Sequence, residues 1–290
     1  DCLAMSTDAT NPARGGGVYA TGTLTLMRST ISNSTALSSN GAESFGGAAY
    51  VSGFSSHYST VSGNDARAAG GAQSFAGGVV VTGIADVEGS TISQNYASSI
   101  GALWSNAGAL IANSTISGNV GASGLGGVAT SGGSVNLFNS TIAFNRSIAG
   151  TSNGNGLYML GGTLTLDSSI IADNSGEPGA TDLAGFGVQV AGGHSLVTSS
   201  TLMLPVGNGN IEGVCPKLDP LLDNGGYTHT HGLNHASPAI DTGNAGNTTL
   251  DQRGAARPTG IAADIGALER QPTDLDERIL ASNFDGFCDF

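Results

Sequence analysis

Charge of either sign is scarce in this chain, and positive charge is the scarcer. Only 11% of the 290 residues are charged, and nine Lys and Arg stand against 22 Asp and Glu, which gives a net charge of −13. The single lysine is Lys217. Because binding to nucleic acid phosphates needs clustered Lys and Arg, this composition excludes nucleic acid as a partner.

Long apolar runs and a complete set of cysteine pairs are also missing. No stretch approaches the roughly 18 apolar residues of a membrane span, so the chain is predicted not to span a membrane. Three cysteines leave at least one unpaired. Cys215 and Cys288 are the candidate disulfide, which would staple the C-terminal tail, and Cys2 would have lost an upstream partner. The start without Met indicates a processed protein or an excised fragment. No signal peptide is visible, so export is inferred from composition.

Glycine and short aliphatic runs are abundant instead. The chain has 47 glycines, and 39% of its residues are apolar. Short β-branched runs between glycines favour many strands over helices. One phrase recurs, as STISNS, STVSGN, STISQN, STISGN and STIAFN, beginning at Ser29, Ser59, Ser90, Ser114 and Ser140. Repeats of 20–50 residues are typical of solenoids and propellers.

Each repeat holds three short apolar elements in a fixed order: a run after a glycine pair, a second run such as 23–27, and the hexapeptide. Three strands suit one coil of a right-handed parallel β-helix, whereas a propeller blade needs four strands and about 40 residues. In such a coil, alternate side chains point inward and stack on the next coil about 4.8 Å away. The predicted interior column is Ile31, Val61, Ile92, Ile116 and Ile142.

The residue before each hexapeptide is predicted to form a sharp bend, because several of these residues are Gly or Asn, which tolerate the left-handed conformation. The units vary in length mostly between the end of the hexapeptide and the next glycine pair. The longest of these segments read STALSSNGAESF and DARAAGGAQSFA. We predict that they are loops projecting from one corner of the solenoid, where binding residues often lie.

The repeat fades after about residue 200, and a different set of motifs follows. They are DPLLDNGGYTHTHGLNHASPAIDTGN from Asp219, DQRGAARP from Asp251 and ADIGALE from Ala263. This order of motifs resembles the choice-of-anchor Q domain of secreted bacterial proteins, which typically closes a pectate-lyase-like right-handed parallel β-helix. The resemblance implies a secreted or cell-surface location. The final stretch, DERILASNFDGFCDF, is similar to the short tails of proteins exported by Gram-negative bacteria.

These observations divide the chain into a solenoid over 1–204 and a C-terminal capping or anchor-type region over 205–290, packed on the last coils. The last coil of a solenoid exposes backbone edges and apolar side chains unless it is covered. Hydrogen bonds and ion pairs among four residues are predicted to hold this irregular cap together: Asp251, Arg253, Arg257 and Asp264.

Two classes of polysaccharide-degrading enzyme use this fold and are the alternatives to a non-catalytic role. A polyuronate lyase needs a base near the sugar C5 proton and a positive group or Ca²⁺ at the carboxylate. The solenoid has few basic residues, and no two of its arginines fall in aligned columns. A glycoside hydrolase, the less favoured of the two, needs two or three carboxylates in neighbouring coils, and no paired-Asp motif is present. Ca²⁺ is expected only for a lyase.

The segment THTHGLNH places His229 and His231 on one face of a predicted strand, an arrangement that would suit a transition metal. Because the third ligand is uncertain, a structural histidine bonded to backbone is the favoured interpretation, and no metal or cofactor is expected to be required. The chain carries no EF-hand loop, P-loop or Ser-His-Asp signature.

Aromatic residues carry the most direct functional signal. Tyr19, Tyr50 and Tyr158 occupy equivalent positions in their coils, and Trp104 lies one position out of that register. Alternation predicts an outward row of rings that can stack on sugars. Alternatively, the rings only cover the sheet or pack beneath the loops, and Trp104 points inward. We therefore predict a secreted or surface-exposed scaffold or adhesin-like protein, non-catalytic, that binds glycans or other surface partners and can self-associate.

Overall fold

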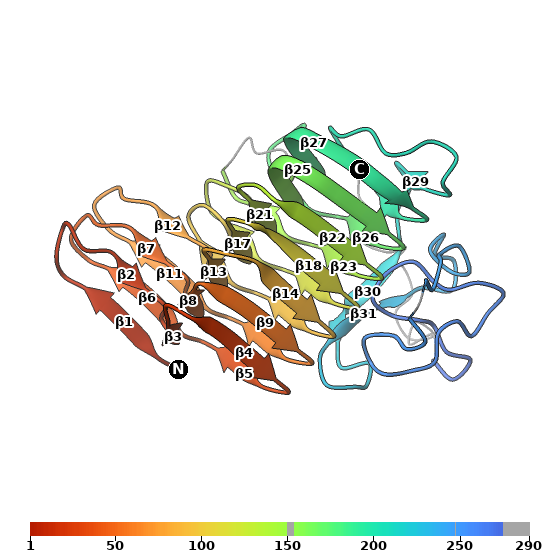
Figure 1. The fold of residues 1–290 in the computed structure, drawn as a ribbon, viewed down its shortest axis with the longest axis horizontal. Coiled ribbons are helices and arrows are strands. Elements are labelled where there is room, and N and C mark those ends of the chain that lie inside the picture. The colour runs from red at the N-terminus through yellow and green to blue at the C-terminus, as the bar shows by residue number, and fades with distance from the viewer. Residues whose placement is uncertain (150–153, 247, 275–290) are drawn as a thin grey trace.

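The computed structural model describes residues 1–149, 154–246 and 248–274. This part of the chain is all-β without any helix, and its parallel strands stack as a right-handed parallel β-helix (Figure 1). The fold class predicted from the repeats is confirmed. Among the described residues, no helix is long and apolar enough to cross a membrane.

A twelve-stranded sheet, the long sheet, forms two panels of the solenoid. Its first panel contains β3 (Val18–Tyr19), β8 (Ala49–Val51), β13 (Val79–Val81), β17 (Leu103–Ser105) and β21 (Val128–Thr130). Its second panel contains β4 (Thr23–Met27), β9 (Gly53–His57), β14 (Ala85–Glu88), β18 (Gly108–Ala112) and β22 (Ser134–Phe138). Two strands run through both panels: β25 (Leu157–Asp167) and β27 (Leu183–Gly193).

The hexapeptide strands and two strands that follow them form a second sheet of eight strands, the hexapeptide sheet. Its strands are β5 (Thr30–Ser32), β10 (Thr60–Ser62), β15 (Thr91–Ser93), β19 (Thr115–Ser117), β23 (Thr141–Ala143), β26 (Ile170–Ala172), β28 (Leu196–Val197) and β29 (Ile211–Glu212). The pairing therefore continues beyond residue 204, to Glu212.

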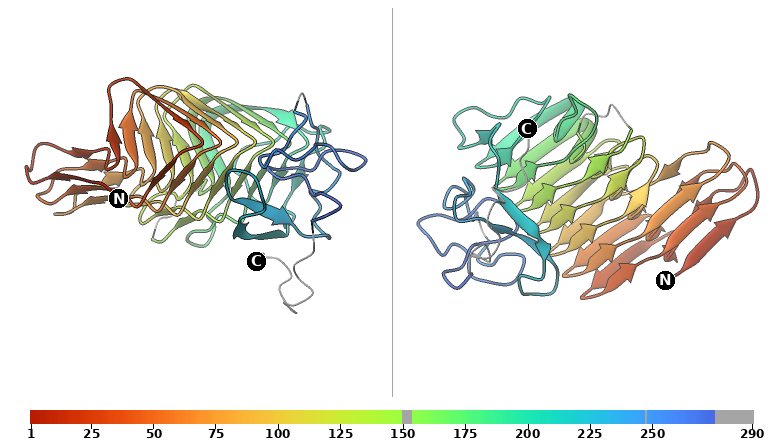
Figure 2. Two further views of the ribbon diagram at one scale, coloured as in Figure 1. Left: turned by 90° about the horizontal axis from the view of Figure 1, so that it is seen from below. Right: turned by 180° about the vertical axis from the view of Figure 1, so that it is seen from behind.

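The two panels and the hexapeptide sheet supply the three predicted strands per coil, and two further sheets add to them. The third sheet contains β1 (Leu3–Ser6), β6 (Thr35–Ser38), β11 (Asp65–Ala68), β16 (Tyr96–Ala97), β20 (Val120–Gly121) and β24 (Arg146–Ser147). The short sheet contains β2 (Ala13–Arg14), β7 (Ser44–Phe45) and β12 (Ser74–Phe75). The two long segments predicted to be loops thus carry strands, β6 with β7 and β11 with β12. They extend the first coils sideways into a narrow N-terminal projection (Figure 2).

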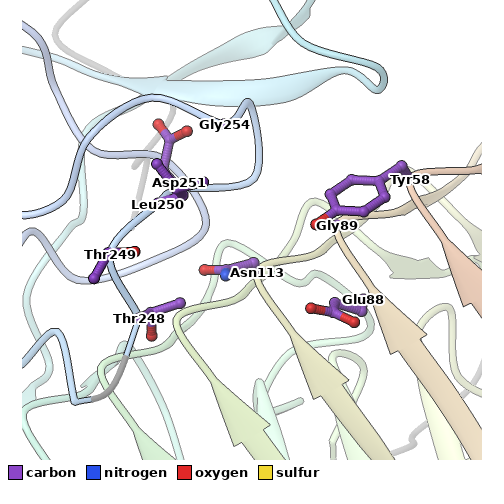
Figure 3. A pocket seen from close by; sticks show the side chains of 9 residues that line it. All are labelled: Tyr58, Glu88, Gly89, Asn113, Thr248, Thr249, Leu250, Asp251 and Gly254. Carbon is purple, nitrogen blue, oxygen red and sulfur yellow. The ribbon is translucent and has the colours of Figure 1, made fainter.

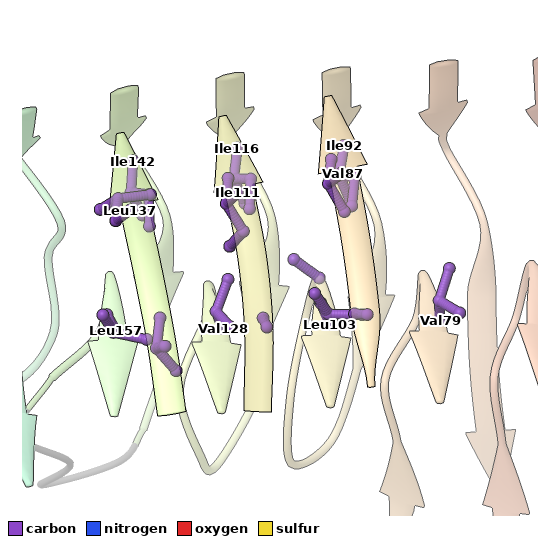
Figure 4. Close-up of a cluster of buried hydrophobic side chains, with 14 of the residues drawn as sticks. Val79, Val87, Ile92, Leu103, Ile111, Ile116, Val128, Leu137, Ile142 and Leu157 are labelled. Carbon is purple, nitrogen blue, oxygen red and sulfur yellow. The ribbon is translucent and has the colours of Figure 1, made fainter. Parts of the chain in front are cut away.

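The interior consists of stacked aliphatic columns. Val61, Ile92, Ile116 and Ile142 are fully buried and pair in register from coil to coil, with half-buried Ile31 at the N-terminal end. Matching columns come from the two panels of the long sheet, and Figure 4 shows their side chains meeting in the centre of the coils. These columns remove most of the aliphatic surface from water, which is the main source of stability in a solenoid.

Glycine is required at the glycine pairs for a steric reason. A Cβ atom on Gly47 would collide with the backbone of Asp65 and Gly77, and one on Gly77 would collide with the backbone of Tyr96. The chain entering each coil therefore passes against the strand that leaves the hexapeptide sheet. Only glycine allows this close approach.

Two ladders, rows of polar side chains that are hydrogen-bonded from coil to coil, explain the Ser and Asn residues of the hexapeptide. From the second hexapeptide on, the side chain of the first Ser accepts a hydrogen bond from the backbone N–H of its equivalent in the preceding coil, as Ser90 does from Ser59 at 3.0 Å. The asparagines that end the hexapeptides form a second, buried ladder in the same way. Asn119 Oδ1, for example, accepts hydrogen bonds from the backbone N–H and from Nδ2 of Asn95, at 3.0 and 2.9 Å. The residue before each Ser has a positive φ, so the predicted bends are present: Arg28, Tyr58, Gly89, Asn113, Asn139 and Ser168.

The described part of the C-terminal region packs along the outer face of the hexapeptide sheet (Figure 2). Thr91 Oγ1 donates to the carbonyl of His229, and Thr115 Oγ1 donates to Gln252 Oε1, each at 2.7 Å. The sequence predicts a capping region packed on the last coils. Its described part lies along a side face of the stack, where it buries the outward threonines Thr91, Thr115 and Thr141. At the end of the stack, Leu202 and Leu204 pack on the interior cluster. The antiparallel strands β30 (Leu218–Leu222) and β31 (Thr230–Leu233) belong to this region.

The four polar residues expected to hold the C-terminal region together lie in one buried network. Arg253 pairs with Asp251 at 3.0 Å, and Arg257 Nε lies 3.2 Å from Glu269 Oε2 without the alignment of a hydrogen bond. Burial raises the pKa of the Asp264 carboxyl to about 6. Cys2 is an exposed free thiol. The pairing of Cys215 with Cys288 stays a prediction, because Cys288 lies outside the described residues.

Candidate functional site

The candidate aromatic residues lie in one column on the outer face of the first panel of the long sheet, and Val80 and Ala129 interrupt this column. Tyr19, Tyr50, Val80 and Trp104 pair in register, followed by Ala129 and Tyr158. The rings of Tyr19 and Tyr50 stack with centroids 5.8 Å apart. Alternation exposes these rings because their strand neighbours, such as Ala49 and Val51, point into the core.

Trp104 corrects the sequence-based expectation. It pairs directly with Val80 and Ala129, so it lies in the same column as the tyrosines and not one position out. Its neighbours Leu103 and Ser105 are fully buried, and the indole ring is half-buried on the outer side. Its Nε1–H donates to Ser131 Oγ at 2.9 Å. The indole face thus belongs to the surface, where a ligand can contact it.

Two aromatic residues that the sequence analysis did not single out enlarge this surface. Phe45 and Phe75 pair in the short sheet, and their rings stack at 5.1 Å. Phe45 contacts Tyr50 edge-on at 6.0 Å, and Phe75 contacts Trp104 at 5.2 Å. The signal that could have found them is the repeated dipeptide Ser-Phe, before the glycine in one coil and before Ala76 in the next. We call the continuous surface the aromatic tract: Tyr19, Phe45, Tyr50, Phe75 and Trp104.

The only cation that contacts the aromatic tract among the described residues is Arg14. Its guanidinium lies 5.9 Å from the Phe45 ring centroid and 5.4 Å from that of Tyr50. At the other end, Tyr158 and Trp104 pack on a small apolar cluster of Ile100, Leu125 and Ala129. The tract therefore offers ring faces, one positive charge and hydroxyl groups along the solenoid axis, which suits an extended ligand with alternating C–H faces and hydroxyls.

The two histidines considered as metal ligands lie in different environments. His229 is exposed, and His231 is buried with both ring nitrogens engaged. Nδ1 of His231 donates to the Asp219 carbonyl at 2.7 Å, and Nε2 accepts from Ser117 Oγ at 2.8 Å. Across the described ranges, no cluster of three or more His, Cys, Asp or Glu is arranged to hold a metal ion.

Acidification is expected to loosen the C-terminal region through His231. Burial lowers the pKa of His231 from 6.5 to about 4, so the folded protein holds it neutral. Its contribution to stability is complete above pH 6.5 and is lost as the pH falls from 6.5 to 4, because the unfolded chain takes up the proton first. The loss is about 3 kcal/mol. Unfolding measured against pH should show this slope in wild type and in His229→Gln, but a smaller slope in His231→Gln. Equal slopes in all three proteins would contradict it.

Asp173 and Asp182 form the carboxyl pair most relevant to a glycoside hydrolase. Burial, together with the charge of Asp182, raises the pKa of Asp173 to about 7. Both oxygens of Asp182 are occupied, since Oδ1 accepts from the N–H and Nδ2 of Asn174, and Oδ2 accepts from Ser199. Asp182 therefore ends the asparagine ladder, and neither of its oxygens is free to act on a sugar.

A pocket lies where the C-terminal region meets the bends of the solenoid (Figure 3). It has a volume of about 230 Å³. Glu88, at the end of β14, is its charged lining residue on the solenoid side. The remaining lining residues are mostly polar or small: Tyr58, Gly89, Asn113, Thr248, Thr249, Leu250, Asp251 and Gly254.

No family model, curated protein or solved structure matches this chain.

Proposed function

We propose that this protein is a secreted or cell-surface β-helical scaffold that binds glycans through the aromatic tract. The observation that carries the proposal is the continuity of five rings drawn from two sheets. Tyr19 stacks on Tyr50 in the long sheet, and Phe45 and Phe75 of the short sheet connect Tyr50 to Trp104 across the coil that carries Val80. Neighbouring rings at contact distance give an extended, rigid and amphipathic surface. Such surfaces lose little conformational entropy when a ligand binds.

Three further features support this role and location. The rings lie on paired strands rather than on long loops, so their spacing is held by the coils. Arg14 adds a positive charge, which favours glycans that carry carboxylate or other anionic groups. The resemblance of the C-terminal motifs to the choice-of-anchor Q domain supports display outside the cell, and lateral or end-to-end self-association of the solenoid is a compatible arrangement.

Removing two rings of the tract should abolish most glycan retention. We expect the double variant Tyr19→Ala/Tyr50→Ala to bind about 30-fold more weakly, if each ring contributes about 1 kcal/mol. The measurement is depletion or affinity electrophoresis against a broad panel of neutral and acidic polysaccharides, scored for both binding and cleavage. Tyr96→Ala, which removes an exposed ring outside the tract, is the matched control. Equal retention by all three folded proteins, or no retention by wild type across the panel, would refute the proposal.

A further inference from the structure

Three polar side chains on the second panel of the long sheet form a connected chain of hydrogen bonds. Ser55 and His57 are two residues apart on β9, so both point outward from the same strand. Glu88 is directly opposite His57 on β14, although 31 residues separate them in sequence. Ser55 Oγ lies 2.9 Å from His57 Nε2, and His57 Nδ1 lies 3.0 Å from Glu88 Oε2.

The chemistry of the three groups determines the direction of these bonds. An ionised carboxylate can only accept, so the Nδ1 of His57 carries the proton that Glu88 receives. In the neutral ring, Nε2 then has the free lone pair, and the Ser55 hydroxyl donates to it. A hydroxyl bonded to a basic nitrogen whose ring is oriented by a carboxylate is the arrangement that activates serine nucleophiles.

The stacking of the coils does not require this chain of hydrogen bonds. The positions equivalent to Ser55 in neighbouring strands are Thr25 and Asp86, and those equivalent to His57 include Met27. The residues of the core and of both ladders repeat from coil to coil, but among the described coils this combination occurs once, with Ser55 and His57 in one coil and Glu88 in the next. The site is also accessible, because the side chains of His57 and Glu88 are 25% and 47% exposed.

We propose that Ser55, His57 and Glu88 form a hydrolytic site for small O-acyl esters, the acyl groups that decorate glycans being the natural class. Ser55 Oγ attacks the ester carbonyl carbon while its proton passes to His57 Nε2. The bond from that carbon to the alcohol oxygen then breaks, and the alcohol leaves with the proton from His57. Water attacks the acyl-serine with His57 again as the base, which releases the carboxylic acid and restores Ser55.

The surroundings set the expected substrate and rate. Glu88 also lines the pocket of Figure 3, whose hydroxyl, amide and aromatic lining suits the alcohol part of a sugar ester. The backbone N–H groups of β9 face strands on both sides and are used in sheet pairing, so they do not form an oxyanion hole. Exposed Thr25, beside Ser55, is the adjacent hydroxyl donor in register. A slow esterase is therefore expected, because one oxyanion donor is typically worth about 10²–10³ in kcat.

The first experiment uses p-nitrophenyl acetate, which requires no glycan binding. Wild type should release p-nitrophenol above the buffer rate, and mass spectrometry should find an acetyl group on the peptide that contains Ser55. Ser55→Ala and His57→Gln should reduce hydrolysis at least 100-fold. Ser52→Ala is the matched control, because Ser52 is an exposed serine of the same coil that bonds the Thr21 carbonyl. Hydrolysis unchanged in Ser55→Ala, or no hydrolysis by wild type, would overturn the proposal.

Glu88 acts through His57 and is a positioning residue, so its test needs a spectroscopic measurement as well. Glu88→Ala, which removes the acceptor, should slow hydrolysis and remove the low-field proton resonance of His57 Nδ1 that wild type shows, while thermal unfolding stays unchanged. Absence of that resonance from wild type would contradict the assigned direction of the bonds.

A second substrate, acetylated xylan, distinguishes the hydrolytic site from the glycan-binding function proposed above. Only the natural substrate class of the hydrolytic site rests on that proposed function. If the Tyr19→Ala/Tyr50→Ala variant loses retention but keeps hydrolysis of p-nitrophenyl acetate, the tract and the hydrolytic site are independent. If wild type cleaves the small ester but releases no acetate from the polysaccharide, the glycan ester class is wrong.

Discussion

Replacing Asn119 with alanine is expected to destabilise the solenoid by about 3 kcal/mol, since each buried polar group left without a partner costs about 1–3 kcal/mol. Asn119 is fully buried in the asparagine ladder. Its Oδ1 accepts from both the N–H and Nδ2 of Asn95, and its own Nδ2 donates to the Ile92 carbonyl and to Asn145. Alanine leaves these groups unsatisfied in the interior.

Thermal and urea unfolding would measure this loss. Asn106→Ala is the control, because Asn106 is exposed and uses its backbone N–H to bond the Val81 carbonyl. Because each coil contacts only its neighbours, the loss should lower the midpoint of the central coils and broaden the transition. An Asn119→Ala protein that unfolds at the same midpoint as Asn106→Ala would show that the ladder contributes nothing to stability.

The second large effect is expected at Arg257. Its side chain is buried beside Glu269, and its Nη2 donates to the Gly266 carbonyl at 2.9 Å. Burial lowers the pKa of Arg257, while the charges of Glu269, Asp251 and Asp264 oppose that shift. Arg257→Met removes the positive charge that offsets the negative charges of these three buried carboxyl groups. Breaking a buried ion pair costs about 3–5 kcal/mol, so the C-terminal region should lose most of its protection.

Hydrogen exchange followed by mass spectrometry would locate the effect. Protection should fall across 218–268 and remain in the central coils, because the network of Arg257 lies within the C-terminal region. Arg146→Met removes an exposed arginine on β24 and should leave both regions unchanged. Uniform loss of protection over the whole chain would show that the coils depend on this region for their own stability.

The sequence predicted the coils because their chemistry is local and repeated. Ile92 and Ile116 occupy the same place in hexapeptides that differ at one position, so the interior column follows from spacing and alternation alone. The register of Trp104 was missed because its coil has only a loose copy of the glycine pair, which removes the reference point for counting. The strands within the long segments were missed because two-residue strands such as β7 have no recognisable period.

The candidate sites depended on contacts between coils, which a linear pattern does not contain. Both ring contacts join the short sheet to the long sheet. Phe45 and Tyr50 are near each other in sequence, but Phe75 and Trp104 are far apart in sequence and belong to successive coils. The bond from His57 to Glu88 depends on a register that the loop lengths decide. Sequence alone could list these side chains and could not pair them.

The sequence by itself therefore determined the β-helix, its aliphatic interior and its bends, because each coil repeats the same steric and hydrophobic requirements. Only the tertiary structure decided that the C-terminal region covers a side of the stack, that five rings join into one tract, and that Ser55, His57 and Glu88 meet. The physical reason is that parallel stacking fixes which residues become neighbours across coils, and the lengths of the connecting segments set that register.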